Sequence, residues 1–296
     1  MGDLTVTEYG VGPGAYGVAL APDGSVWTTL VESGALCRLD VDGHVERIPL
    51  DGDQSRPMVL TAGPDGAVWF SRGDGQIGRV DPDGTVSAVR VPTPAGSPYG
   101  LCAGPDGALW YTLLAADRIG RLTLDGRAEE FPLAAASMPS LVTTGPDGSL
   151  WFTLNRANAI GRSTTRGEIA VFGLPTADAA PVGIHAAAAA VPSGRSGVWF
   201  TEIGAGQLGR IDTDGRIEEF PLPDRSCRPH AVAATADGGC WATLWATSSL
   251  VRVGVDGAVI DQVRFREGAE PHGLALAPDG AVWVALEAGY LARVGG

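Results

Sequence analysis

The sequence predicts an all-β protein, a seven-bladed β-propeller with four antiparallel strands per blade, and three observations carry this prediction. Tryptophan recurs at intervals of 41 or 42 residues, with one interval of 48, as Trp27, Trp69, Trp110, Trp151, Trp199, Trp241 and Trp283. Short runs of β-type residues between turns fill every interval. No segment carries a sustained helical period. Repeats of about 40 residues with four strands each are typical of propeller blades.

The third unit shows the four elements of one blade in order. An apolar run forms the first strand, and the Pro105-Asp106-Gly107 turn leads to the second strand, which contains Trp110. A third strand follows. The Asp125-Gly126 turn, where glycine supplies a positive φ at low cost, leads to the fourth strand. The strands are predicted over residues 100–103, 108–112, 119–123 and 127–133. The other units repeat this order, except that a longer segment, 192–197, replaces the first turn of the fifth unit.

The two ends of the chain are predicted to close the ring. The last unit stops at Gly296, one strand short of a full blade. The chain begins with a strand-like run at 5–9, which resembles the fourth strand at 217–220. This run should therefore complete the seventh blade and cover a sheet edge that would otherwise be exposed. We expect a single domain over residues 1–296.

Composition excludes several functional classes. The 21 basic residues are all arginine, so the lysine required by a P-loop or a Schiff base is missing. A net charge of −13 argues against nucleic acid, and the lack of an apolar run of about 18 residues argues against a membrane span. The four cysteines form no C-x-x-C pair, and no secretory signal precedes the repeats. We therefore expect reduced thiols in the cytoplasm.

The repeat provides an internal control, because positions that are alike in every copy serve the scaffold and positions that differ are free for function. The repeated tryptophans are predicted to pack between blades. An arginine in the third strand of each copy is predicted to contact a turn or the next blade. These arginines are Arg38, Arg79, Arg121, Arg162, Arg210, Arg252 and Arg293.

Two variable positions per blade should surround one mouth of the central channel. The first lies on the innermost strand and holds Tyr16, Met58, Tyr99, Ser140, Val182, His230 and His272. The second follows the repeated tryptophan by four residues and holds Val31, Gly73, Leu114, Asn155, Ile203, Trp245 and Glu287. The chain has 4 histidines, and two of them stand at the first position in adjacent blades.

One sector of this mouth collects the reactive side chains. Counting outward from the hairpin turn places His272 opposite residues 286–287, and Glu270 lies two residues before His272. Two carboxylates and an imidazole can hold a divalent cation and move a proton, since carboxylate oxygens suit Mg²⁺ and histidine suits acid–base work near neutral pH. His230 and Trp245 belong to the neighbouring blade six. The alternative is a set of unrelated polar residues on a wet channel rim.

The other two histidines are expected to stay outside the chemistry. His44 falls in a turn between the third and fourth strands of blade one and should be solvated. His185 lies in the first strand of the irregular fifth blade. For His185 we favour a structural role over a position facing the channel.

Two motifs resemble the streptogramin B lyase (virginiamycin B lyase) family. They are Arg228-Pro229-His230-Ala231 and Glu270-Pro271-His272-Gly273, in blades six and seven, and Glu287 follows at the corresponding place after Trp283. The repeat text is also similar along essentially the whole chain, for example at 151–153 and 160–162. The chain departs from the family where leucine replaces a frequent glutamate at the end of most second strands, and in an alanine-rich insertion at 186–190.

The resemblance implies a monomeric, Mg²⁺-dependent carbon–oxygen lyase that linearises cyclic streptogramin B depsipeptides without hydrolysis and confers antibiotic resistance. It implies that Glu270 and Glu287 bind Mg²⁺, that His272 transfers the proton and that His230 contacts the substrate. Further substrate contacts are implied for Tyr16, Tyr99, Trp245 and Met58. Two alternatives remain: a propeller hydrolase acting on another cyclic ester or lactone, and a propeller that binds a ligand without catalysis.

Overall fold

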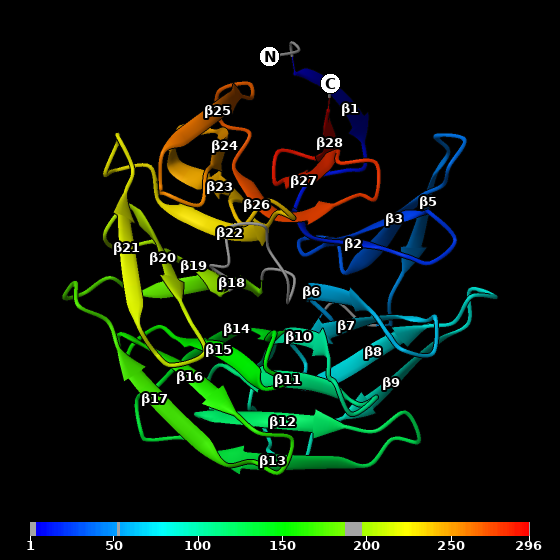
Figure 1. The fold of residues 1–296 in the computed structure, drawn as a ribbon. Helices are drawn as coiled ribbons and strands as arrows, with labels where there is room; N and C mark the ends of the chain where they lie inside the picture. The colour runs from blue at the N-terminus through cyan, green and yellow to red at the C-terminus, as the bar shows by residue number, and fades with distance from the viewer. Residues whose placement is uncertain (1–3, 52–53, 187–196, 296) are drawn as a thin grey trace.

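The computed structural model describes residues 4–51, 54–186 and 197–295, and it is all-β. Seven four-stranded antiparallel sheets surround a central axis, as Figure 1 shows, with the first strand of each sheet innermost. The only helix within these residues is the single 3₁₀ turn η1 (Trp245–Thr247), and nothing in the described chain offers a helix long and apolar enough to span a membrane. The predicted fold class is confirmed.

Blades one to four follow one another along the chain, and each runs from the axis outward. Blade one contains β2 (Ala15–Leu20), β3 (Val26–Leu30), β4 (Ala35–Leu39) and β5 (Val45–Pro49). Blade two contains β6 (Pro57–Ala62), β7 (Val68–Arg72), β8 (Gln76–Val80) and β9 (Val86–Arg90). Blade three contains β10 (Pro98–Ala103), β11 (Leu109–Leu113), β12 (Arg118–Leu122) and β13 (Ala128–Pro132). Blade four contains β14 (Pro139–Thr144), β15 (Leu150–Leu154), β16 (Ala159–Ser163) and β17 (Ile169–Gly173).

The last three blades complete the circle. Blade five contains β18 (Pro181–Ala186), β19 (Val198–Glu202), β20 (Gln207–Ile211) and β21 (Ile217–Pro221). Blade six contains β22 (Pro229–Ala234), β23 (Cys240–Leu244), β24 (Ser249–Val253) and β25 (Val259–Arg264). Blade seven contains β26 (Pro271–Leu276), β27 (Val282–Leu286) and β28 (Tyr290–Gly295), and its fourth strand is β1 (Thr5–Gly10) from the other end of the chain.

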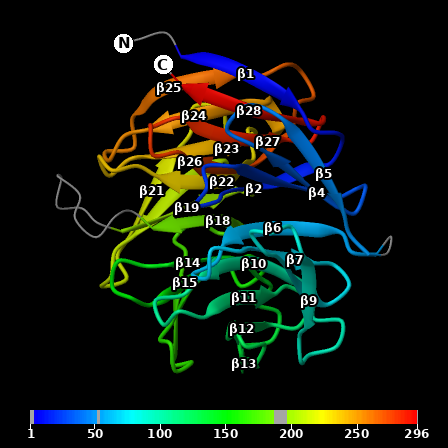
Figure 2. The ribbon, with the colours of Figure 1, turned by 90° about the vertical axis from the view of Figure 1, so that its right-hand side faces the viewer.

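The ring closes through the N-terminal strand, as predicted. β1 pairs antiparallel with β28 from Thr5 opposite Gly295 to Gly10 opposite Tyr290. Figure 2 shows β1 lying beside β28 at the outer edge of blade seven, near both termini. Because this sheet combines the first and last strands, opening the ring requires breaking a complete strand pairing, which protects the edge of β28.

The strand bounds of the third unit differ from the prediction by one or two residues. β10 begins at Pro98 rather than Gly100, because Pro98 still faces Leu113 across the sheet. β11, β12 and β13 are shifted by one residue at their ends. The irregular fifth-blade segment, 187–196, with most of the alanine-rich insertion, lies outside the described residues.

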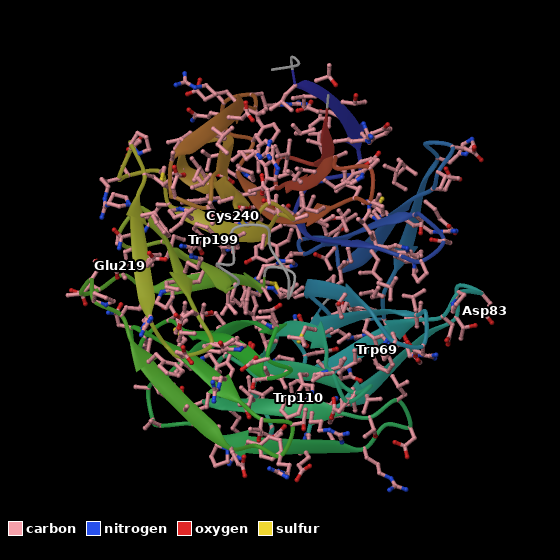
Figure 3. The ribbon with its side chains drawn as sticks, viewed as in Figure 1. Trp69, Asp83, Trp110, Trp199, Glu219 and Cys240 are labelled. Carbon is pink, nitrogen blue, oxygen red and sulfur yellow. The ribbon has the colours of Figure 1, made fainter. Side chains whose placement is uncertain are left out.

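The repeated tryptophan, turn aspartate and arginine form one cluster in the scaffold. In blade three the carboxylate of Asp106 accepts hydrogen bonds from the Trp110 indole N–H at 3.1 Å and from Arg121 Nε at 2.6 Å. The tryptophans are buried between sheets, so Trp69 of blade two packs in one cluster with Tyr111 of blade three. Figure 3 shows Trp69 and Trp110 within the ring of sheets. The predicted packing and turn contacts are therefore present.

An aromatic residue in the second strand explains the glycine that recurs in the third strand. The facing pairs in blades two to five are Phe70 with Gly78, Tyr111 with Gly120, Phe152 with Gly161 and Phe200 with Gly209. A Cβ added at Gly161 would lie 2.1 Å from the Phe152 ring. In the other blades the second-strand residue is smaller and the third-strand residue is larger: Thr28 faces Cys37, Ala242 faces Val251 and Val284 faces Ala292. Each pair thus fills a similar space in the close-packed interior.

We expect Gly161→Ala to lower the free energy of unfolding by about 1–3 kcal/mol, because the added methyl group overpacks the Phe152 ring. Chemical denaturation measures the change. The double variant Phe152→Val/Gly161→Ala copies the blade-seven pair Val284–Ala292 and should be less destabilised than the sum of the two single variants. Simple additivity would contradict the packing explanation.

Candidate active site at the channel mouth

Each innermost strand enters the mouth through a residue with left-handed backbone. The residue before the strand has a positive φ in all seven blades: Gly14, Arg56, Ser97, Met138, Ala180, Arg228 and Glu270. In blade seven the carbonyl of Glu270 accepts the N–H of Glu287 at 3.1 Å, and in blade six the carbonyl of Arg228 accepts the N–H of Trp245 at 3.1 Å. The backbone therefore pairs the rim positions, Glu270 with Glu287 in blade seven and Arg228 with Trp245 in blade six.

His272 and His230 both follow the first residue of a strand, where the ladder is interrupted. In blade seven Pro271 faces Leu286 and Leu274 faces Val284, with a β-bulge between the two pairs. Counting from the turn therefore gave the wrong register for His272, because a bulge adds a residue to one strand only. Glu287 follows the end of β27 and lies across from Glu270 instead. The two side chains nevertheless meet at the mouth.

The imidazole of His272 contacts the carboxylate of Glu287. The Nε2 atom of His272 lies 2.6 Å from the Oε2 atom of Glu287. His272 is buried, whereas the Glu287 side chain is 36% exposed. Burial lowers the pKa of His272 to about 4, so the ring is neutral at pH 7. A neutral ring that faces a carboxylate carries its proton on Nε2. Nδ1 is buried and has no hydrogen-bond partner in the described part of the chain.

The two tyrosines and the second histidine form a connected group beside His272. The Tyr16 and Tyr99 hydroxyls lie 2.5 Å apart, and the Tyr16 hydroxyl is 3.3 Å from Nε2 of His230. The ring centroids of Tyr16 and His272 are 4.5 Å apart, and those of His230 and His272 are 4.7 Å apart. Burial, followed by the neighbouring Tyr99, raises the pKa of Tyr16 well above its ordinary value. The phenols stay protonated and donate hydrogen bonds.

Blade six adds an aromatic and cationic wall. The Trp245 ring lies 6.3 Å from the His272 ring, and the Arg228 guanidinium carbon lies 5.6 Å from the Trp245 ring centre, within cation–π range. From the sequence, Arg228 was recognised only as part of the Arg228-Pro229-His230-Ala231 motif, without a role of its own. Arg228 stands directly before Pro229-His230, just as Glu270 stands before Pro271-His272. This equivalent position could have indicated a place for Arg228 at the site.

The carboxylates of Glu270 and Glu287 fit a hydrated Mg²⁺. Glu270 makes no hydrogen bond or ion pair with its side chain in the described chain, and it lines an open groove of about 540 Å³ with Trp245 and Phe265. Mg²⁺ commonly takes one or two protein carboxylates and keeps several waters. Among the described residues, three ligand atoms lie within 4.8 Å of one another only at Asp40, Asp42 and His44. Glu270 and Glu287 belong to no such group, so an ion held by them would take most of its ligands from water.

The remaining histidines lie away from this sector. His44 is exposed in the turn between β4 and β5, where the Asp40 carboxylate accepts the N–H groups of Asp42 and His44. Asp40 thereby closes the turn, which gives this acidic cluster a structural explanation. His185 Nδ1 accepts the N–H of Ala234 from blade six at 3.2 Å, which agrees with the structural role we favoured.

Because of His230, the free energy of unfolding should decrease as the pH is lowered. Burial, and next the neighbouring His272, lowers the pKa of His230 to about 3. Between pH 6.5 and about 3 the unfolded chain binds a proton that the folded protein does not, so stability is lost by up to about 1.4 kcal/mol per pH unit. Denaturant unfolding at several pH values measures the slope. His230→Gln should reduce it, and His44→Gln should leave it as in the wild type; equal slopes in all three proteins would contradict the assignment.

A family model and two solved structures that match this chain carry the same name. A family model described as the virginiamycin B lyase family matches residues 2–294. The crystal structure of selenomethionine-substituted virginiamycin B lyase from Staphylococcus aureus is 34% identical with a TM-score of 0.93, covering 99% of each chain. A catalytically inactive histidine-to-alanine variant of virginiamycin B lyase from Staphylococcus aureus, solved with quinupristin, is 33% identical with a TM-score of 0.92, again covering 99% of each chain.

Curated relatives match over shorter segments. Virginiamycin B lyase from Bordetella parapertussis is 42% identical over 66 residues, which is 21% of this chain and 22% of that relative. Virginiamycin B lyase from Mycolicibacterium vanbaalenii is 46% identical over 57 residues, 19% of each protein. The matched segments thus span about a fifth of these relatives, whereas the solved structures match throughout.

Proposed function

Because the chain belongs to the virginiamycin B lyase family, we propose that it linearises cyclic streptogramin B-type depsipeptides by elimination at the threonyl ester. The observation that carries the proposal is the His272–Glu287 contact of 2.6 Å at the channel mouth. A buried, neutral imidazole oriented by a carboxylate is a suitable general base for removing a proton from carbon. The relative solved with quinupristin supports the substrate class.

The proton chemistry is assigned to His272. The imidazole of His272, oriented by the Glu287 carboxylate, accepts the α-proton of the threonine residue. The electrons of the C–H bond form the Cα–Cβ double bond, and the Cβ–O bond breaks with its electron pair on the ester oxygen. The products are a carboxylate and a dehydrobutyrine end, and no water is added. Glu287 stabilises the imidazolium that forms, because opposite charges then face each other.

Four neighbouring residues would bind and orient the macrocycle. Tyr16 lies against one side of the His272 ring, and Trp245 lies further out in blade six. Tyr99 and His230 hold the Tyr16 hydroxyl by the contacts of 2.5 and 3.3 Å. Their rings offer a largely apolar surface, which excludes water from the base and strengthens the electrostatic interactions there.

Glu270 and Glu287 would hold Mg²⁺. When bound, the ion would polarise the ester carbonyl and stabilise the negative charge that develops as the α-proton leaves. The side chain of Glu270, which has no hydrogen bond or ion pair within the described residues and lines an open groove, supports this assignment.

We also propose that the protein acts as a monomer in the cytoplasm and protects its host from streptogramin B. A single chain closes the ring and supplies every side chain named above. The free cysteines Cys37, Cys102, Cys227 and Cys240 agree with a reducing compartment. Light scattering tests the monomer, and growth of a sensitive host carrying the gene in the presence of streptogramin B tests the protective role.

Mass spectrometry of the product tests the reaction. Incubation of the protein with a streptogramin B and Mg²⁺ should give a ring-opened product with the mass of the substrate. A product heavier by one water would indicate a lactone hydrolase on the same fold. An intact substrate that nevertheless binds and stabilises the protein would indicate a binding propeller, and either result would overturn the proposed elimination.

A further inference from the structure

A threonine hydroxyl in blade six bridges the two histidine-bearing strands. Thr243 Oγ1 accepts the N–H of Ala231, the neighbour of His230, at 2.9 Å and donates to the carbonyl of His272 in blade seven at 2.8 Å. Thr243 is fully buried. Its two partners lie where the strand ladders are interrupted by bulges, so the hydroxyl takes the place of the missing sheet hydrogen bonds.

The same bridge occurs in other blades. Its role in the scaffold can therefore be compared with its role beside the two histidines. In blades one, three, four and five a threonine hydroxyl donates to the carbonyl of the mouth residue in the next blade: Thr29 to Met58, Thr112 to Ser140, Thr153 to Val182 and Thr201 to His230. In blade two Ser71 bonds only to Val59 of its own blade, and blade seven has Ala285 at this position. Five of the seven seams between blades therefore carry the bridge.

Two consecutive bridges fix the histidines relative to each other. Thr201 holds the carbonyl of His230, and Thr243 then ties Ala231 to the carbonyl of His272. Within the described residues the side chain of His272 has a single hydrogen bond, to Glu287, so the direction of its ring depends on where the backbone places its Cα–Cβ bond. Nothing in the regular ladder defines that backbone, because His272 lies in the bulge between Pro271 and Leu274.

We propose that Thr243 is a positioning residue for the reaction, which sets the His272 ring against Glu287 and Tyr16 through the backbone carbonyl of His272. The inference rests on the proposed function for its effect on turnover, but its structural part stands independently. Misplacement of a catalytic group by about 1 Å can lower a rate by about 100-fold. The hydroxyl therefore affects the chemical step more than substrate binding.

Paired variants separate positioning from stability. Thr243→Val and Thr153→Val each remove a buried bridging hydroxyl while keeping a similar side-chain shape, and both should lower the melting temperature by similar amounts. Thr243→Val should lower kcat by about 10- to 100-fold with little change in KM. Thr153→Val, whose bridge ends at Val182, should keep the wild-type kcat, and Thr243→Ser should restore it. Equal kcat values for the two valine variants would overturn the proposal.

A second readout does not depend on turnover. The ring centroids of Tyr16 and His272 are 4.5 Å apart, so labelled wild-type protein should give an NMR cross-relaxation signal between the two rings. Thr243→Val should weaken this signal and Thr153→Val should retain it. If the wild type opens no streptogramin ring, the proposed function fails while this comparison still decides the positioning role. An unchanged signal in Thr243→Val would refute that role.

Discussion

His272→Ala is expected to lower the rate of ring opening by about 1,000-fold or more and to leave the fold intact. General bases typically contribute factors of about 100 to 10,000, and here removal of the α-proton depends on the one imidazole that faces Glu287. The melting temperature should change by less than about 4 °C, which corresponds to about 1 kcal/mol for a protein of this size. The variant loses one side-chain hydrogen bond but also removes the buried, unpaired Nδ1.

Steady-state kinetics and thermal unfolding measured on the same preparation check both halves of this expectation. His44→Ala is the matched control, since His44 lies exposed in a turn of blade one. It should turn over the substrate like the wild type. Full activity of His272→Ala would remove His272 from the mechanism, and a cooperative loss of structure would assign it to the scaffold instead.

The second large effect is expected at Glu270, where activity and stability should move in opposite directions. Its backbone has a φ of 50° and precedes Pro271, a conformation that costs a residue with a Cβ about 1 kcal/mol more than glycine. Glu270→Gly should therefore raise the free energy of unfolding by about 1 kcal/mol. The same change should lower activity by about 100-fold or more, since it removes a carboxylate proposed to hold Mg²⁺.

Two further variants distinguish these effects. Glu270→Gln keeps the backbone strain and should lose activity without gaining stability. Ala180→Gly removes the same strain at the corresponding position of blade five, where φ is also 50°, and should gain stability while keeping its activity. Thermal unfolding with and without Mg²⁺ adds a direct readout, because any stabilisation by the ion should disappear in both Glu270 variants and persist in Ala180→Gly. Mg²⁺-dependent stabilisation that persists in both Glu270 variants would exclude Glu270 as a ligand.

The scaffold could be predicted because its signals are local and repeated. Seven copies of a tryptophan and an arginine, six of them with the Asp-Gly turn, define where each blade begins, and the Asp106–Trp110–Arg121 cluster shows why these three recur together. The glycine of the third strand is explained only by the aromatic ring that faces it in the structure, as Phe152 faces Gly161. Two residues that face each other on neighbouring strands cannot be matched until the register of the strand pair is known.

The mouth positions could also be predicted, but their contacts could not. The prediction placed Tyr16 in blade one and Tyr99 in blade three, yet it did not bring their hydroxyls together across blade two. It paired His272 with 286–287 because a bulge leaves no clear mark in the sequence. The role of Thr243 was missed altogether, because a threonine in a buried strand looks like ordinary β-sheet composition until its partners in two blades are seen.

The sequence by itself determined the number of blades, the closure by β1 and the identity of the residues at the mouth, since all three follow from the period of the repeat and the places where it varies. Only the tertiary structure decided which groups meet: Glu287 with His272, Tyr16 with His230, and Glu270 with an open groove. The reason is physical. Bulges, left-handed rim residues and bridging hydroxyls take their geometry from contacts between blades, and residues in neighbouring blades are separated by about 40 positions of chain.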